Sequence, residues 1–201
     1  MSSDIIIQKK LERDFYLRPT LDVAQDLLGK YLVYNNNGQK ISVRLVEVEA
    51  YIGEDDPACH AAVGKTARNE IMYRSGGFSY IYFIYGMYFC LNIVTESAGY
   101  PAAVLIRGAE PIEGIEIIQQ NYPDAKNGRY TDGPGKLCKA LGLNREKNGL
   151  DLTENSLYLE NREYKVKRVI KTARIGIKKA TRRKWRFFDA DSEFVSVSKK
   201  N

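Results

Sequence analysis

Short apolar segments separated by turn residues constrain the fold of this chain more than any other feature of its sequence. One pair of segments flanks the run Asn35-Asn-Asn-Gly38, which favours the positive φ angles of a hairpin turn, and another pair meets at Gly86. The predicted strands cover residues 30–34, 40–52, 78–85, 88–95, 102–107 and 194–198, with a further hairpin around Asn161 over 157–170. Strands joined by such short turns favour an antiparallel sheet.

Helical patterns are clustered rather than placed between successive strands. Thr20 is predicted to cap a helix that Gly29 ends, and Pro111 is predicted to open another helix whose apolar stripe includes Ile115 and Ile118. The predicted helices cover residues 21–28, 67–73, 111–122 and 136–141. We therefore expect a single α+β domain over residues 1–201, with a curved, largely antiparallel β-sheet flanked by helices and a flexible arm at residues 1–10.

The chain is basic, with a net charge of +6 at pH 7 and a pI near 9.1. This charge favours a polyanionic partner, although an excess of lysine on an ordinary globular protein is the alternative. Basic side chains concentrate in the C-terminal third and interleave with Trp185, Phe187 and Phe188, a composition suited to phosphate contacts. The basic residues there are Arg162, Lys165, Lys167, Arg168, Lys171, Arg174, Lys178, Lys179, Arg182, Arg183, Lys184 and Arg186.

Cysteine and histidine usage limits the metal chemistry. Cys59, Cys90 and Cys138 show no metal-ligand spacing. His60 is the only histidine, which excludes a histidine-rich metal site but leaves a carboxylate-bound metal open. The apolar run near the N-terminus is too short for a signal peptide, and no apolar run approaches about 20 residues. We expect an intracellular protein in a reducing compartment, without a membrane span.

Two carboxylates, Glu47 and Glu49, lie two residues apart in one predicted strand and therefore on the same face of it. Like charges on one strand face do not stabilise a sheet, so both residues are candidates for acid–base chemistry. The alternative is a solvated strand face, or pairing with Arg44. Tyr51 lies on the same face and His60 follows in a loop, where rings could hold a flat group; an ordinary loop histidine is the alternative for His60.

A tyrosine-rich segment follows at residues 79–90. Tyr80 and Tyr82 share one face of its first strand. A glycine then permits a tight turn that would place Tyr85 and Met87 at an exposed hairpin tip. Apolar side chains at such a tip can wedge between the base steps of DNA, whereas the alternative is an ordinary aromatic sheet face with a plain turn.

These motifs, in this order, resemble the alkyladenine (3-methyladenine) DNA glycosylase family, in its mammalian-type branch. The matching strings are Arg-Leu-Val-Glu-Val-Glu-Ala-Tyr-Ile-Gly (44–53), Arg-Asn (68–69), Tyr-Ile-Tyr-Phe-Ile-Tyr-Gly-Met-Tyr-Phe-Cys-Leu-Asn (80–92), Leu-Ile-Arg-Gly-Ala-Glu-Pro (105–111), Asp-Gly-Pro-Gly-Lys-Leu-Cys-Lys-Ala-Leu (132–141) and Ala-Arg-Ile-Gly-Ile (173–177). The resemblance spans residues 11–198, and its first and third strings together are highly specific.

The resemblance implies roles for residues at the matching positions. Glu49 would be the general base that deprotonates the attacking water, and Arg107 would lie near that water and the phosphate of the flipped nucleotide. Tyr85 would enter the minor groove and fill the gap in the base stack. The expected base-binding pocket consists of Tyr51, His60, Tyr82, Asn92 and Ile175. The family uses no metal or other cofactor and forms no covalent enzyme intermediate.

The implied activity is that of a monofunctional DNA glycosylase of base excision repair. Such an enzyme would bind double-stranded DNA as a monomer, rotate an alkylated or deaminated purine out of the duplex and hydrolyse its N-glycosidic bond. One alternative is a catalytically silent nucleic-acid-binding module of the same fold. Another is a metal-dependent nuclease that uses Glu47, Glu49, Asp55 and Asp56.

Overall fold

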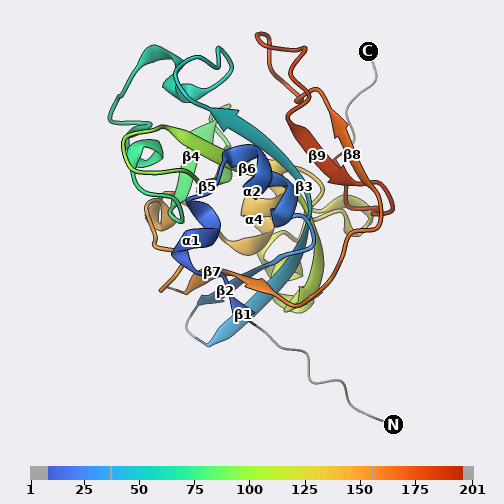
Figure 1. Cartoon of the computed structure of the whole chain (residues 1–201). Helices are drawn as coiled ribbons and strands as arrows, with labels where there is room; N and C mark the ends of the chain where they lie inside the picture. The colour runs from blue at the N-terminus through green and yellow to red at the C-terminus, as the bar shows by residue number, and fades with distance from the viewer. Residues whose placement is uncertain (1–8, 37, 155, 197–201) are drawn as a thin grey trace.

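The computed structural model describes residues 9–36, 38–154 and 156–196, which build an antiparallel sheet with helices packed against it (Figure 1). The strands are β1 (Lys9–Lys10), β2 (Tyr31–Asn36), β3 (Gln39–Ile52), β4 (Ser79–Ile84), β5 (Tyr88–Val94), β6 (Ala102–Glu113), β7 (Leu157–Asn161), β8 (Val169–Thr172) and β9 (Arg186–Asp189). Among the described residues the main path of the sheet is β1-β7-β2-β3-β6-β5-β4, and β9 pairs with both β3 and β8. Each of these pairings is antiparallel.

Two of the helices cover the middle of the sheet. The α-helices are α1 (Arg13–Tyr16), α2 (Thr20–Leu27), α3 (Ile115–Asn121) and α4 (Pro134–Leu141), and short 3-10 helices occur at η1 (His60–Val63), η2 (Glu70–Tyr73), η3 (Lys126–Gly128) and η4 (Arg145–Lys147). Helix α2 contacts β3 and β6, whereas α4 contacts β5 and β6 (Figure 1). Their buried side chains, such as Leu27 and Leu137, join strand residues such as Val43 and Ile106 in one core. The prediction of an α+β domain with a largely antiparallel sheet is confirmed.

The start of α2 differs from its prediction. Thr20 is the first helical residue rather than the cap, and Pro19 occupies the cap position without a side-chain hydrogen bond. The backbone N–H of Thr20 donates to Oε1 of Glu96 at 2.7 Å, so a carboxylate distant in sequence satisfies a backbone N–H at the start of the helix. Gly29, with φ of 81°, follows the helix end as predicted.

Other predicted helix boundaries are wrong at their N-terminal ends. Pro111 lies inside β6, and α3 begins at Ile115 after Gly114, whose φ is 73°. The helix predicted over 67–73 is only the 3-10 turn η2. Proline is tolerated in β6 because it stands at a register shift of the ladder with β3, where an N–H donor is dispensable.

The C-terminal part also pairs differently from its prediction. Strands β7 and β8 form no hairpin around Asn161, since β7 pairs with β1 and β2 while β8 pairs with β9. Of the strand predicted at 194–198, residues 194–196 lie outside any strand and residues 197–198 lie outside the described residues. The arm predicted at 1–10 is described only at Lys9–Lys10, which form β1. No helix within the described ranges is both long and apolar enough to cross a membrane.

Strand β3 changes partners along its length, and this places the two carboxylates of the sequence motif. Up to Arg44 the strand pairs with β2, whereas Glu47 and Glu49 lie opposite β9. On its other side β3 pairs with β6, and the register shifts twice around Glu47, first skipping Val46 of β3 and then Arg107 of β6. Such bulges redirect side chains. Arg107 is thereby the extra residue of β6 beside the carboxylates.

Candidate active site

A cavity of about 550 Å³ lies between β3, the β4–β5 hairpin, β6, η1, the start of α4 and the segment 175–177. Its volume is in the ordinary range of small-molecule sites. Seven of the eight predicted site residues line it, namely Tyr51, His60, Tyr82, Tyr85, Asn92, Arg107 and Ile175. The eighth, Glu49, lies directly behind three of them. The fold therefore brings these seven predicted residues from five separate parts of the chain to one cavity.

Glu49 is fully buried and held by three neighbours. The backbone N–H of Ile175 donates to its Oε1 at 2.7 Å, and the Tyr51 hydroxyl donates to its Oε2 at 2.8 Å. The guanidinium of Arg107 lies 3.4 Å from Oε1 and 3.5 Å from Oε2. Burial raises the pKa of Glu49, and Arg107 and the two hydrogen bonds only partly oppose this, so the carboxylate is a stronger base than an exposed glutamate.

Neither glutamate belongs to a solvated strand face, and neither pairs with Arg44. Glu47 is fully buried as well, and Arg44 instead pairs with Glu110 of β6. Arg107 contacts both glutamates, with Nε 3.1 Å from Oε1 of Glu47. Burial alone would lower the pKa of Arg107, but the two carboxylates outweigh it and raise the pKa, so the guanidinium stays charged.

Aromatic rings form one side of the cavity. The rings of His60 and Tyr82 meet edge to face, with centroids 4.5 Å apart. Nδ1 of His60 is 2.8 Å from the hydroxyl of Tyr80, a fully buried residue on the strand face that Tyr82 shares. Burial and the charge of Arg68 lower the pKa of His60 to about 4. The imidazole is therefore neutral at neutral pH and adds no positive charge to the cavity.

Asn92 and Cys90 line the cavity from β5. The side-chain N–H of Asn92 donates to the carbonyl of Tyr80 at 3.1 Å, which fixes the amide orientation. Burial raises the pKa of the Cys90 thiol to about 11, and that of Cys59 likewise. Cys138, the third buried thiol, lies in the core with its pKa also raised by burial.

Tyr85 stands at the tip of the β4–β5 hairpin, as predicted. Its side chain is 79% exposed and its φ is 55°, in the left-handed region. Gly86 follows with φ of 69°, and Met87 is also exposed. The placement of Tyr85 at an exposed tip is confirmed, whereas its insertion into DNA stays a prediction.

Sequence reasoning missed an ion pair that fastens two loops of the site together. The guanidinium of Arg174 donates to Oδ2 of Asp56 at 2.5 Å and to Oδ1 at 2.8 Å, and both side chains are fully buried. The same guanidinium donates to the carbonyl of Ala50 and lies over the rings of Tyr51 and Trp185. Arg174 therefore holds in place the segment that includes Ile175, whose backbone N–H donates to Glu49. Its place in the matched 173–177 string was the available signal.

The four carboxylates of the nuclease alternative do not form one cluster. Asp56 is bound by Arg174, and Glu47 by Arg186, whose Nε lies 2.6 Å from Oε1. No group of three or more His, Cys, Asp or Glu side chains in the described parts of the chain is arranged to hold a metal ion.

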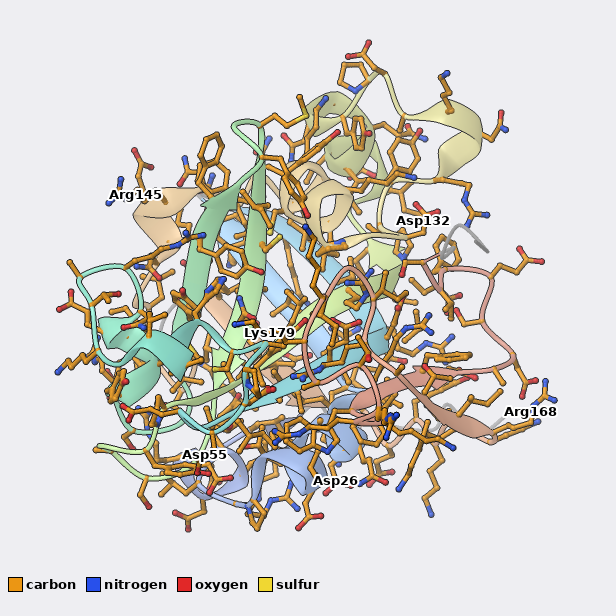
Figure 2. All side chains as sticks on the ribbon, turned by 90° about the horizontal axis from the view of Figure 1, so that it is seen from above. Asp26, Asp55, Asp132, Arg145, Arg168 and Lys179 are labelled. Carbon is orange, nitrogen blue, oxygen red and sulfur yellow. The ribbon has the colours of Figure 1, made fainter. Side chains whose placement is uncertain are left out.

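The basic C-terminal third divides into buried and exposed parts. Arg174 and Arg186 are buried in ion pairs, so neither is free to contact phosphate. The exposed basic residues are Lys165, Lys167, Arg168, Lys171, Lys178, Lys179, Arg182 and Lys184. In Figure 2, Lys179 lies near the middle of the view and Arg168 toward its edge. Lys136, which also lines the cavity, is paired with Asp132 at 2.8 Å.

Comparison with known proteins identifies the family of this chain. A family model described as Methylpurine-DNA glycosylase (MPG) matches residues 14–193. A protein of Methanocella arvoryzae with the name "Putative 3-methyladenine DNA glycosylase" is 52% identical over 191 residues, covering 92% of this chain and 95% of its own length. Proteins with the same name from Desulfitobacterium hafniense and Wolbachia sp. subsp. Brugia malayi are 45% and 50% identical, covering 94% and 88% of this chain and 99% and 95% of their own lengths. The chain therefore belongs to the methylpurine-DNA glycosylase family, and the protein is a DNA glycosylase.

Proposed function

We propose that the protein hydrolyses the N-glycosidic bond of alkylated or deaminated purines in duplex DNA, using a water molecule activated by Glu49. The observation that carries this proposal is the arrangement of Glu49 at the back of an aromatic cavity, oriented by Ile175, Tyr51 and Arg107. The names of the relatives agree with a 3-methyladenine substrate. We also propose that the chain belongs to the mammalian-type branch of the family. The relatives named above are archaeal and bacterial.

Base flipping is the first step of the proposed mechanism. A purine inside the duplex cannot reach the cavity, so its nucleotide must rotate outward at a cost of about a few kcal/mol. Tyr85 is suited to offset that cost because its exposed ring can occupy the vacated place in the stack. The flipped base would then lie between Tyr51, His60 and Tyr82, with Asn92 contacting its edge. Electron-rich ring faces attract a cationic alkylated purine, and the neutral His60 does not repel it.

Hydrolysis follows when water reaches the Glu49 carboxylate. Tyr51, Arg107 and Ile175 line the cavity and contact that carboxylate, so the water would enter between them. Glu49 accepts the proton of the attacking water, and its negative charge stabilises the oxocarbenium-like charge that develops on the sugar. An alkylated purine is already a cationic leaving group, so its departure needs no further proton, whereas a neutral deaminated purine must gain a proton as it leaves. The mechanism uses neither a metal nor a covalent intermediate.

The proposal extends to the setting of the reaction. The protein would act as a monomer on double-stranded DNA, with the exposed lysines and arginines of residues 165–184 contacting phosphates. It would work in a reducing intracellular compartment, the cytoplasm and nucleoid or the nucleus, where its free thiols persist.

Replacement of Glu49 by Gln tests the proposal. Glu49→Gln should abolish release of the base from an alkylated-purine duplex, while binding to that duplex stays within about tenfold, because only the water-activating charge is lost. Glu54→Gln is the matched control, since Glu54 is an exposed carboxylate just beyond the same strand. Both reactions are run with excess chelator to separate a glycosylase from a metal-dependent nuclease. Substantial turnover by Glu49→Gln would refute the assignment, and binding without base release by the parent would favour the silent module.

A further inference from the structure

The second carboxylate of β3, Glu47, is fully buried yet has no place in the mechanism above. It accepts hydrogen bonds from Nε of Arg107 at 3.1 Å and from Nε of Arg186 at 2.6 Å. It also accepts from the hydroxyl of Ser196 at 2.8 Å and from the backbone N–H of Ser196 at 2.6 Å. A buried carboxylate is tolerated only when it is paired in this way, so Glu47 joins β6, β9 and the C-terminal segment at one point.

The C-terminal segment lies directly against this point. A side chain at Gly108, the register partner of Glu47, would come within 2.6 Å of the carbonyl oxygen of Phe194 and 3.2 Å of Cβ of Glu47. Ser196 is buried as well, and its hydroxyl accepts from Nη2 of Arg107 at 3.3 Å. Residues 194–196 are therefore fastened beneath the site by Glu47 and Arg107 rather than by strand pairing.

Arg107 is held more closely by Glu47 than by Glu49. Its Nε lies 3.1 Å from Glu47 but 3.4 Å from Glu49, and its Nη1 reaches Glu49 at 3.5 Å. Arg107 is the extra residue in a bulge of β6, so the ladder does not fix its side chain. We propose that Glu47 is a positioning residue, which fixes the Arg107 guanidinium beside Glu49 and fastens residues 194–196 beneath the site. The inference rests on the proposed function for its kinetic consequence only.

The charge of Glu47 also affects the pKa of Glu49, the proposed general base. The charged and titratable groups facing Glu49 are Glu47 and Tyr51 from β3, Arg107 from β6, Tyr82 from β4 and Arg174 from the segment before β9. Among these, the negative charge of Glu47 raises the pKa of Glu49, whereas Arg107 lowers it. Loss of the Glu47 charge removes this repulsion, and a displacement of Arg107 by a fraction of an ångström still leaves its guanidinium within reach of Glu49. The pKa of Glu49 would then fall. The pH at which acidification abolishes base release would therefore also be lower.

Glu47→Gln tests the inference, because it removes the charge but preserves the shape. We expect the single-turnover rate of base release to fall about 10-fold to 100-fold, as for a reacting group displaced by a fraction of an ångström, with duplex affinity within about threefold. The acid limb of the pH–rate profile should move to lower pH. Hydrogen exchange of the backbone amides of residues 194–196 should accelerate. Glu110→Gln is the control, since it breaks another Arg–Glu pair of β6 away from the cavity and should change none of these.

Three results would overturn the inference. They are a parental rate in Glu47→Gln, an acid limb that does not move, and a rate loss that disappears when the folded fraction is restored at lower temperature. If Glu47→Gln does not fold, Ser196→Ala replaces it, because this variant removes only one hydroxyl from the same network. It should slow base release about twofold to tenfold, the value of one hydrogen bond, and accelerate exchange at 194–196. If the proposed function is wrong, Glu49→Gln will keep full activity. The hydrogen-exchange measurement would still test the role of Glu47.

Discussion

The buried pair between Asp56 and Arg174 leads to a quantitative prediction. Both side chains are fully buried and joined by two hydrogen bonds, and Asp56 also accepts from the backbone of Ala58. Asp56→Asn would leave the Arg174 charge buried without its partner, which typically costs about 3–5 kcal/mol. A chain of 201 residues loses about 2–4 °C in Tm for each kcal/mol, so the Tm should fall by about 6–20 °C.

The control for this measurement is an exposed pair of the same chemistry. Arg168 and Asp191 are 65% and 53% exposed, with one contact of 2.7 Å. Asp191→Asn should change the free energy of unfolding by about 1 kcal/mol or less. Thermal melting of both variants by circular dichroism at neutral pH gives the comparison. If the Tm of Asp56→Asn were as close to that of the parent as the Tm of Asp191→Asn, the conclusion that the buried pair stabilises the fold would be refuted.

The pH dependence of the Tm provides an independent test of whether the Asp56–Arg174 pair stabilises the fold. Burial alone would raise the pKa of Asp56, but hydrogen bonds from Arg174 and its charge outweigh burial and hold the pKa below its ordinary value. The stabilisation from Asp56 is therefore complete above the pKa of the unfolded chain and is lost as the pH falls through the folded pKa. The difference in Tm between the parent and Asp56→Asn should accordingly narrow in acid. A difference that widens in acid would contradict this reasoning.

Two further predictions concern DNA binding. Tyr85→Ser should cost about 1 kcal/mol or less in stability because the side chain is 79% exposed, yet it should weaken the flipping signal of a fluorescent base analogue; a large melting loss or an unchanged signal would contradict the wedge role. Binding to undamaged duplex should weaken with salt, with a slope of log K against log salt of about −0.9 per phosphate neutralised, and a salt-independent affinity would rule out phosphate contacts by the exposed basic residues.

Much of the fold could be predicted from local patterns. Alternation and turn residues located β2 to β5, and the tip at Gly86, because hairpins are specified by neighbouring residues. The predictions are wrong where contacts with residues distant in sequence determine the local structure. Thr20 begins a helix whose end is satisfied by Glu96, 76 residues away, and Pro111 stays in a strand because β3 lies beside it.

The same distinction applies to the site. The cavity-lining residues were located through strings that resemble a known family. The pairing of Asp56 with Arg174 and of Glu47 with Ser196 was not predicted, because such strings mark positions and do not show which side chains 118 and 149 residues apart will meet. A basic residue in a basic segment gives no sign of being buried. In the folded chain Arg186 is buried where β9 pairs with β3, and Arg174 is buried in its ion pair with Asp56.

The buried thiols have a consequence for the proposed activity on alkylated DNA. The agents that alkylate purines also react with cysteine, and the thiolate is the reactive form. Burial keeps Cys59, Cys90 and Cys138 almost entirely protonated at neutral pH, since it raises the pKa of each. Cys90, although it lines the cavity that would receive damaged bases, is therefore a poor target for the same agents. Because the same agents would create the proposed substrates, burial protects these thiols under the conditions in which the protein would act.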